Sequence, residues 1–411
     1  MLSGYFARLP LTDRITFARE IWAAVFYGVF AGLALPLIPI VARRIGMSPA
    51  GITVMVTMQF IGALFGILLG HMADRRKKIP FVIWPAITGR VMIGLLIFAQ
   101  SPAVYLILVS VFFLTVNLGG PAYASIMRSN YSDANRSRLM GNIRIVIVIV
   151  AAAFSSLAGA LLGRNEGIVR WLFMAASAFG ILSSVAFARV RVRQGPDLPR
   201  DAPSASLLRS LRTVRRNIPF LLFMGILVLC ATPDKLAVPL EPIWLVDFLH
   251  LGYGEASFLL GTVVSLASIA GYFLWARALK RFNSFAVLSV VAFLFAARFA
   301  SLALARVSSQ LLPMSILSGL TNAGWDLVPI FCIITLADRS RFSLYIGFHT
   351  TLFGIRGIIG PSLGTFLYSS GALPLTGIFW VIAAFIACGA GLLMAFSRRP
   401  GVRAPARIRV A

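Results

Sequence analysis

The sequence predicts an all-α membrane protein with twelve spanning helices, arranged as two pseudo-symmetric six-helix bundles. The residues are 59% hydrophobic and only 12% charged, whereas a soluble domain is nearer half apolar and a quarter charged. Apolar runs of about 20 residues, the length that crosses a bilayer, recur along the chain. In addition, residues 33–40 (LALPLIPI) are nearly repeated at 236–243 (LAVPLEPI).

Taken in order, the apolar runs predict the individual helices. The first run, 21–42, follows a basic start and is long enough to span, so we expect an uncleaved helix rather than a signal peptide. The other five of the first half are 50–71, 79–99, 103–127, 139–163 and 169–188. Those of the second half are 218–245, 255–277, 284–305, 309–336, 343–369 and 373–396.

The repeated stretch carries two prolines three residues apart, Pro36 with Pro39 and Pro239 with Pro242. Each proline removes a helical N–H donor and clashes with the preceding turn, so the same device at the same place in both halves indicates duplication. Further matches follow in order, Gly66 with Gly271, Asn117 with Asn322, and Gly159 with Gly364. Pro361 is expected to kink the eleventh helix. Inside a membrane, such a repeat is typical of a transporter.

The only clear domain boundary is the polar segment 189–217, which is rich in arginine, proline and serine. This composition predicts a solvated linker. Within it, 206–216 is either a short basic amphipathic helix on the membrane surface or a plain loop. The predicted bundles are therefore 1–188 and 218–396, and 397–411 forms a basic tail.

The formal net charge of +25 comes from basic residues in short connectors between apolar runs, which argues against nucleic-acid binding. Most lysines and arginines fall on the side that holds both termini. The opposite side holds only Arg43, Arg44, Arg164, Arg170 and Arg306. Because cytoplasmic loops carry the excess of basic residues, both termini and the linker are expected in the cytoplasm. The expected location is a cell membrane, bacterial inner or plasma, with the lipid bilayer as solvent.

The loop after the second span reads Gly70-His71-Met72-Ala73-Asp74-Arg75-Arg76-Lys77-Lys78. It resembles the signature loop of the major facilitator superfamily, matched by Gly70, Asp74 and Arg75, with Lys78 as a later basic position. The resemblance implies secondary transport, and it implies that Asp74 latches one half against the other in one access state. An anion at a helix end can be held by a facing cation or helix N-terminus. The alternative is a basic loop that only fixes orientation.

Charged residues inside spans are costly and usually face a cavity or a partner. Asp326 on the tenth span and Arg356 on the eleventh lie at similar predicted depth. We expect them to approach each other or to share a substrate in the central cavity; the alternative is a neutralising pair without a role in transport. Asn117 and its repeat mate Asn322 are candidate cavity donors.

The seventh span carries Asp234, Lys235 and Glu241 around the repeated prolines. Adjacent residues face different sides of a helix, so Asp234 and Lys235 are not expected to pair. Buried carboxylates suit proton coupling, which makes Asp234, Glu241 and Asp326 the candidate proton carriers. Arg90 and Arg298 are assigned structural roles.

The sequence has no Walker loop, no His/Cys metal cluster and no Gly-x-Ser-x-Gly elbow. We therefore expect neither an enzyme nor a cofactor or metal. The predicted function is secondary transport of a small organic solute by alternating access, with a proton as coupling ion and the chain acting as a monomer. Export of an amphipathic compound and uptake of an anionic metabolite both stay open. The alternative function is a non-transporting membrane scaffold or sensor with the same fold.

Overall fold

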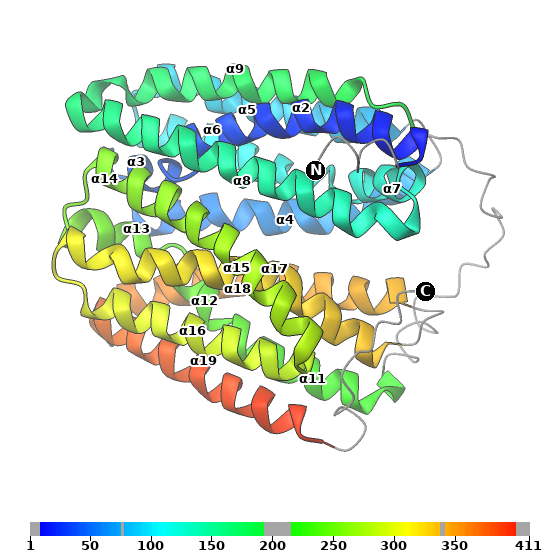
Figure 1. Ribbon diagram of the computed structural model, residues 1–411. Helices are drawn as coiled ribbons and strands as arrows, with labels where there is room; N and C mark the ends of the chain where they lie inside the picture. The colour runs from blue at the N-terminus through cyan, green and yellow to red at the C-terminus, as the bar shows by residue number, and fades with distance from the viewer. Residues whose placement is uncertain (1–8, 75–77, 193–214, 338–341, 400–411) are drawn as a thin grey trace. The chain divides into compact units, whose positions relative to one another are not determined.

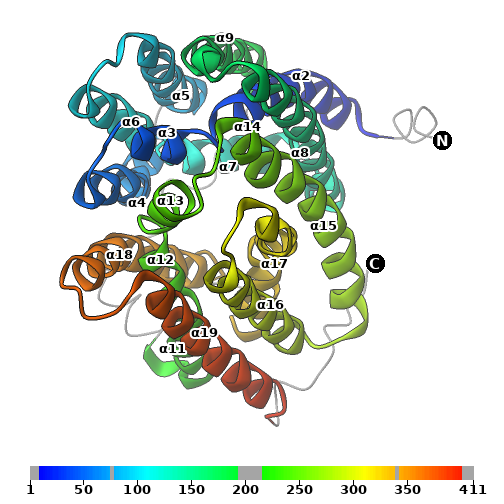
Figure 2. The same ribbon diagram turned by 90° about the vertical axis from the view of Figure 1, so that its left-hand side faces the viewer.

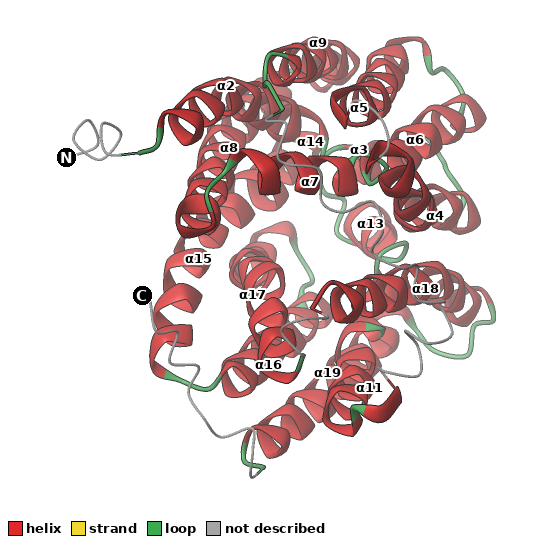
Figure 3. Cartoon of the chain, turned by 90° about the vertical axis from the view of Figure 1, so that its right-hand side faces the viewer, coloured by secondary structure: helices red, strands yellow, loops and turns green. Residues whose placement is uncertain are grey.

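The computed structural model describes residues 9–74, 78–192, 215–337 and 342–399. Within these ranges every regular element is a helix (Figure 3). The chain divides into two compact units. The first comprises residues 1–200 with 252–262, and the second 201–251 with 263–411.

The first unit is a bundle in which the long helix α2 lies between two others. α2 (Leu11–Ala34) packs along α8 (Asp133–Arg164) and α9 (Val169–Ala188) (Figures 1 and 2). α5 (Lys78–Gly94) packs on α9 and on α6 (Pro102–Val116), and α6 in turn packs on α4 (Pro49–Asp74). The shorter elements are α3 (Ile38–Arg44), η1 (Leu95–Phe98), α7 (Gly120–Asn130), η2 (Glu166–Ile168) and α14 (Tyr253–Ala256). The π-helical turn η4 (Ser257–Val263) follows α14.

The second unit is built around α16 (Ser284–Leu304), which packs against α19 (Leu375–Ser397) and α17 (Leu312–Leu336). α15 (Val264–Arg281) packs along α17, and α11 (Ile218–Ala231) along α19. α18 (Phe342–Ser369) contacts the short helix α12 (Pro233–Ala237). The remaining elements are α13 (Glu241–Ile243), the π-helical turn η3 (Trp244–Phe248) and η5 (Ser308–Leu311).

Both copies of the repeated stretch interrupt a helix at the same place. α2 ends at Ala34 and α3 begins at Ile38, while α12 ends at Ala237 and α13 begins at Glu241. The turn between them closes with the same hydrogen bond in each copy. The Leu37 N–H donates to the Ala34 carbonyl at 3.1 Å, and the Leu240 N–H donates to the Ala237 carbonyl at 2.8 Å. A proline in each turn cannot continue the helical ladder, which explains the break.

The first helix begins at Leu11, ten residues before the predicted apolar run. Its opening turns are amphipathic, and Asp13, Thr16 and Glu20 are buried in the bundle. Because these side chains are polar, an apolar-run search did not include the first ten residues of the helix. The predicted seventh span is likewise not one helix but α11, α12, α13 and η3.

Ten helices within the described ranges are long and apolar enough to cross a membrane, and Pro49–Phe65 is a shorter apolar helix. α18 occupies the position of the predicted eleventh span. The chain is therefore an all-helical, multi-pass membrane protein, and the full set of twelve spans stays a prediction.

Candidate functional site

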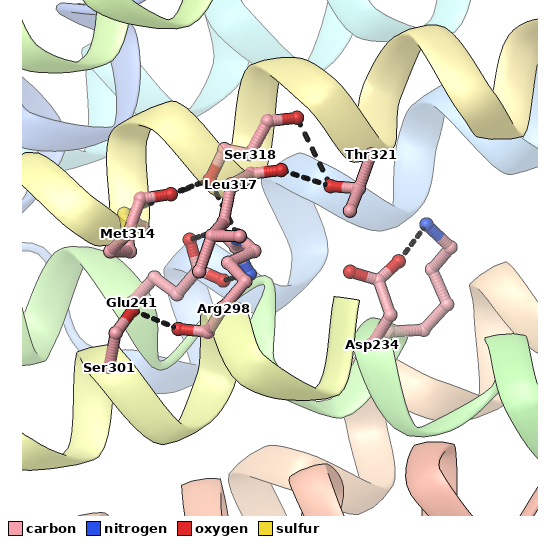
Figure 4. A network of polar contacts seen from close by, with 9 residues as sticks. Asp234, Glu241, Arg298, Ser301, Met314, Leu317, Ser318 and Thr321 are labelled. Carbon is pink, nitrogen blue, oxygen red and sulfur yellow. Dashed lines mark hydrogen bonds and ion pairs between the residues drawn. The ribbon is translucent and has the colours of Figure 1, made fainter. Parts of the chain in front are cut away.

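The intramembrane charges of the second unit gather around the interrupted seventh span. Glu241, directly after the helix break, faces Arg298 of α16 (Figure 4). Both guanidinium nitrogens Nη1 and Nη2 donate to the carboxylate, each at 2.7 Å. The third donor, Nε, bonds the Ser318 hydroxyl of α17 at 2.7 Å. The arrangement ties three helices together at one buried point.

Glu241 was expected to be a candidate proton carrier, and this geometry argues against that role. A bidentate arginine pair stabilises the ionised carboxylate. Arg298 is itself buried and lies over the Phe299 ring at 4.6 Å, so neutralising Glu241 would leave a buried cation without its counter-ion. Glu241 therefore shares its contact with Arg298, for which the sequence predicts a structural role.

Asp234 and Lys235 form an ion pair, contrary to the expectation that sequence neighbours would point apart. The Lys235 Nζ lies 2.5 Å from the Asp234 Oδ2, and both side chains are largely buried. The pair sits on the five-residue helix α12, which starts at a proline after a break at Thr232. The long lysine chain can fold back, and burial leaves the two charges few other partners.

Lys235 and Arg356 approach the same aromatic ring from two helices. The Lys235 Nζ lies 5.7 Å from the centroid of Phe353, and the Arg356 guanidinium carbon lies 5.4 Å from it. α12 and α18 are in intimate contact here, because a Cβ placed on Gly360 would collide with the Cβ of Lys235. The Arg356 Nε is buried and has no hydrogen-bond partner within the described part of the chain. We call Asp234, Lys235, Phe353 and Arg356 the α12–α18 cluster.

Asp326 does not take the predicted place beside Arg356. It is exposed on α17 and accepts a hydrogen bond of 2.7 Å from the Tyr272 hydroxyl of α15. The carboxylate whose charge acts on Arg356 is that of Asp234. The break before α12 brings Asp234 to α18, a neighbour that equal depth along the spans did not predict. That Asp326 and Arg356 share a substrate stays a prediction.

The two asparagines of the repeat have different surroundings. The Asn117 amide donates to the Gln59 carbonyl of α4 at 2.9 Å, which fixes the end of α6. Asn322 is exposed on α17 and has no side-chain hydrogen bond to any described residue. Of the two, Asn322 is the exposed one, and the donor role predicted for both stays a prediction.

The predicted gating residues lie at the end of α4 and the start of α5. Gly70 and Asp74 belong to α4, but the Asp74 side chain lies outside the described part, as does all of Arg75. Lys78 opens α5, and its Nζ donates to the Ser125 hydroxyl of α7 at 2.7 Å. Among the kink candidates, Pro36 and Pro239 lie in the two turns, Pro39 and Pro242 begin the following helices, and Pro361 lies inside a continuous α18.

A buried carboxylate cluster in the first unit was missed from the sequence. Glu20 accepts hydrogen bonds from the hydroxyls of Tyr123, at 2.5 Å, and Tyr131. Asp13 binds the residue that precedes α8, because it accepts from the Ser132 N–H at 3.0 Å and from the Ser132 hydroxyl at 2.7 Å. Burial and the neighbouring Glu20 carboxylate raise the pKa of Tyr131, so its phenol stays a donor. The available signal was two acids seven residues apart on one helix face in a basic segment.

Comparisons with known proteins agree with this architecture. The family model described as Major Facilitator Superfamily matches residues 21–233. The solved nucleoside transporter NupG (D323A mutant) is similar with a TM-score of 0.72 at 13% identity, over 93% of this chain and 99% of that one.

A bacterial homolog of the human lysosomal transporter Spinster is also similar in fold. Its inward-facing, occupied form gives a TM-score of 0.68 at 13% identity, over 95% of this chain and 97% of that one. The inward-facing, unoccupied form gives 0.66 at 14% identity, over 95% and 98%. No curated protein matches the chain. At these identities the likeness shows the fold.

Proposed function

The chain belongs to the major facilitator superfamily, and from this premise we propose that it is a secondary transporter of a small, anionic organic solute. The solute binds at the α12–α18 cluster of the second unit and crosses by alternating access. The observation that supports this proposal is the Arg356 guanidinium on α18, the predicted eleventh span, where it has a buried Nε that no described residue satisfies. A charge is retained at such a depth when it serves a pathway or a ligand.

The chemistry of the cluster favours an anion. Lys235 and Arg356 are two cations near one carboxylate, Asp234, and they flank an aromatic ring. A guanidinium binds a carboxylate or phosphate through parallel hydrogen bonds. A planar solute could also stack on Phe353. NupG is a nucleoside transporter with this fold, so nucleosides and phosphorylated nucleosides belong in the tested panel.

The same cluster offers a coupling mechanism with a proton. Asp234 and an incoming anion compete for the same two cations. Protonation of Asp234 would release Lys235 and Arg356 to the solute, and loss of the proton would return the pair and expel the anion. We therefore propose symport of a proton with the anion, and place the carrier at Asp234 rather than at Asp326.

The test is uptake into proteoliposomes of labelled monocarboxylates, dicarboxylates, nucleosides and nucleotides, with and without an inward proton gradient. An anionic solute should accumulate only with the gradient, and Arg356→Gln should reduce its uptake by at least tenfold. Arg306→Gln, a change at an exposed arginine in a connector, is the matched control. Equal transport by Arg356→Gln would refute the site.

Asp234→Asn separates coupling from binding. It should exchange labelled for unlabelled solute across the membrane yet no longer accumulate it against a gradient. Asp326→Asn should keep both activities. If Asp326→Asn alone uncouples transport, the proton carrier is Asp326 instead. No flux with any solute, together with a stable partner complex, would favour the scaffold or sensor.

The latch proposed at Asp74 has its own test. Asp74→Asn should reduce uptake by at least tenfold, because the halves lose a contact that holds one access state, while the amount of inserted protein stays unchanged. Normal uptake by this variant would leave the basic loop with only a role in orientation.

A further inference from the structure

A pocket lies wholly within the first unit, and no residue of the α12–α18 cluster lines it. Its volume is about 340 Å³, and it lies among α3, η1, α6, the start of α9 and α14. Its walls include the apolar residues Val41, Leu96, Ala99 and Phe173, and its polar groups include Arg170 and Tyr253. The four apolar residues are buried in the fold.

The charged residues in and beside this pocket differ in how many hydrogen-bond and ion-pair partners they have. Glu166 accepts from the Arg44 guanidinium at 2.6 Å and from the Tyr253 N–H at 2.9 Å. The Arg44 guanidinium also covers the Tyr253 ring at 4.3 Å, so this cation has both a counter-ion and an aromatic face. Arg170 acts electrostatically on Tyr253 as well, yet has no hydrogen bond or ion pair to a described residue. The exposed Arg170 is therefore the cation of the pocket lining that has no acceptor among the described residues.

We propose that this pocket binds an amphipathic organic anion. Its apolar body would lie against Phe173, Leu96 and Ala99, and its carboxylate or phosphate would bind Arg170. A volume of this order, apolar walls and one or two placed polar groups are the usual features of a small-molecule site.

The orientation expected from the basic residues places this pocket on the side opposite the cytoplasm. An amphipathic anion can reach it from two sources there. One is the outer solution, as a free organic acid, and the other is the bilayer, as an anionic lipid. Both ligands would be recognised by the same cation and the same apolar walls. Binding at this pocket does not depend on whether the α12–α18 cluster transports a solute.

Binding is tested with the full-length protein in phosphatidylcholine nanodiscs by calorimetric titration of 4-phenylbutyrate, with 4-phenylbutanol as the uncharged comparison. The experiment uses the Arg356→Gln background, so that the proposed transport site does not contribute. The acid should bind at least tenfold more tightly than the alcohol. Arg170→Gln should remove that preference, because it removes the cation and keeps the walls.

Two further kinds of variant serve as controls, one at a neighbouring arginine and one that fills the pocket. Arg164→Gln removes an exposed arginine on the same side that does not line the pocket, and it should bind as the parent does. Ala99→Phe fills the apolar space and should abolish binding of both compounds; if it does not fold, Ala99→Leu should weaken both. Unchanged binding of the acid by Arg170→Gln and by the filled variant would overturn the proposal.

A second titration, with phosphatidylglycerol added to the nanodisc, then distinguishes a lipid from a free organic acid as the natural ligand. If phosphatidylglycerol in the nanodisc weakens the apparent affinity for phenylbutyrate, and Arg170→Gln abolishes that competition, the pocket takes a lipid. If phosphatidylglycerol has no effect while the acid still binds through Arg170, the pocket takes a free organic acid. Both results support an amphipathic-anion site. Phenylbutyrate binding that is unchanged in Arg170→Gln would contradict it.

Discussion

The Glu241–Arg298 pair shows why charges can persist inside an apolar bundle. Each guanidinium nitrogen donates one hydrogen bond, two to Glu241 and one to Ser318. Removal of one partner is expected to be worse than removal of both, because the survivor keeps its desolvation penalty without the compensating attraction.

Glu241→Gln should lower the free energy of unfolding by about 3 kcal/mol, the low end for breaking a buried pair. The double change Glu241→Gln with Arg298→Met should recover most of that loss. Thermal unfolding in detergent measures both, and Arg306→Gln again serves as the control. A double variant less stable than Glu241→Gln alone would contradict this account.

Glu20 should be a second sensitive position, for a different reason. In Glu20→Gln one of the two phenols of Tyr123 and Tyr131 loses its acceptor, and an unsatisfied buried polar group costs about 1–3 kcal/mol. Tyr27→Phe is the control, because the Tyr27 hydroxyl has no hydrogen bond to a described residue. The same thermal assay applies, and equal stability of the two variants would contradict the prediction.

Residue types were more predictable than residue partners. The costly intramembrane residues Asp234, Glu241, Asp326 and Arg356 were visible as charges in apolar runs. Which of them meet depends on the break before α12 and on the reach of long side chains, and neither follows from depth along a regular helix. The pairing of Asp234 with Lys235, and of Glu241 with Arg298, therefore required coordinates.

Among the helices, α18 and α12 cross with very little space between their backbones. A Cβ on Gly364 would collide with the carbonyl oxygen of Leu236, whereas Gly347 on the same helix has open space around it. Small residues at such crossings let helix backbones approach in lipid.

Gly364→Ala should therefore destabilise the protein by about 1–3 kcal/mol through overpacking. It should also lower transport, since it moves α18 away from Lys235. Gly347→Ala should be neutral, or more stable by up to about 1 kcal/mol, because alanine is the better helix former. Thermal unfolding and uptake distinguish the two, and equal effects would mean that the crossing is not tight.

Helix positions were largely readable because apolar length dominates the signal in a membrane protein. The exceptions have physical causes. The polar opening turns of α2 are buried by tertiary contacts, and the two helix breaks follow the prolines rather than hydropathy. The internal repeat indicated that the two proline sites are equivalent, and the structure interrupts the helix at the same place in both copies.

For the chain in its membrane, the distribution of basic residues makes a definite prediction about orientation. In a background with Cys230, Cys332 and Cys388 changed to serine, a cysteine at Ser204 in the linker should react with an impermeant thiol reagent only from the cytoplasmic side. A cysteine at Ser308 should react only from the opposite side. Labelling of intact and opened cells measures this, and reversed accessibility would invert the topology.

The two helix breaks also bear on how freely each half can change its sequence. Ile38 and Glu241 occupy the same place in the repeat, directly after the turn. Ile38 is anchored through its carbonyl, which accepts from the Tyr105 hydroxyl at 2.8 Å, whereas Glu241 is anchored through its side chain. Any residue supplies a carbonyl, so position 38 can drift among apolar residues. Position 241 can change only together with position 298, and the second half carries an evolutionary constraint that the first half avoids.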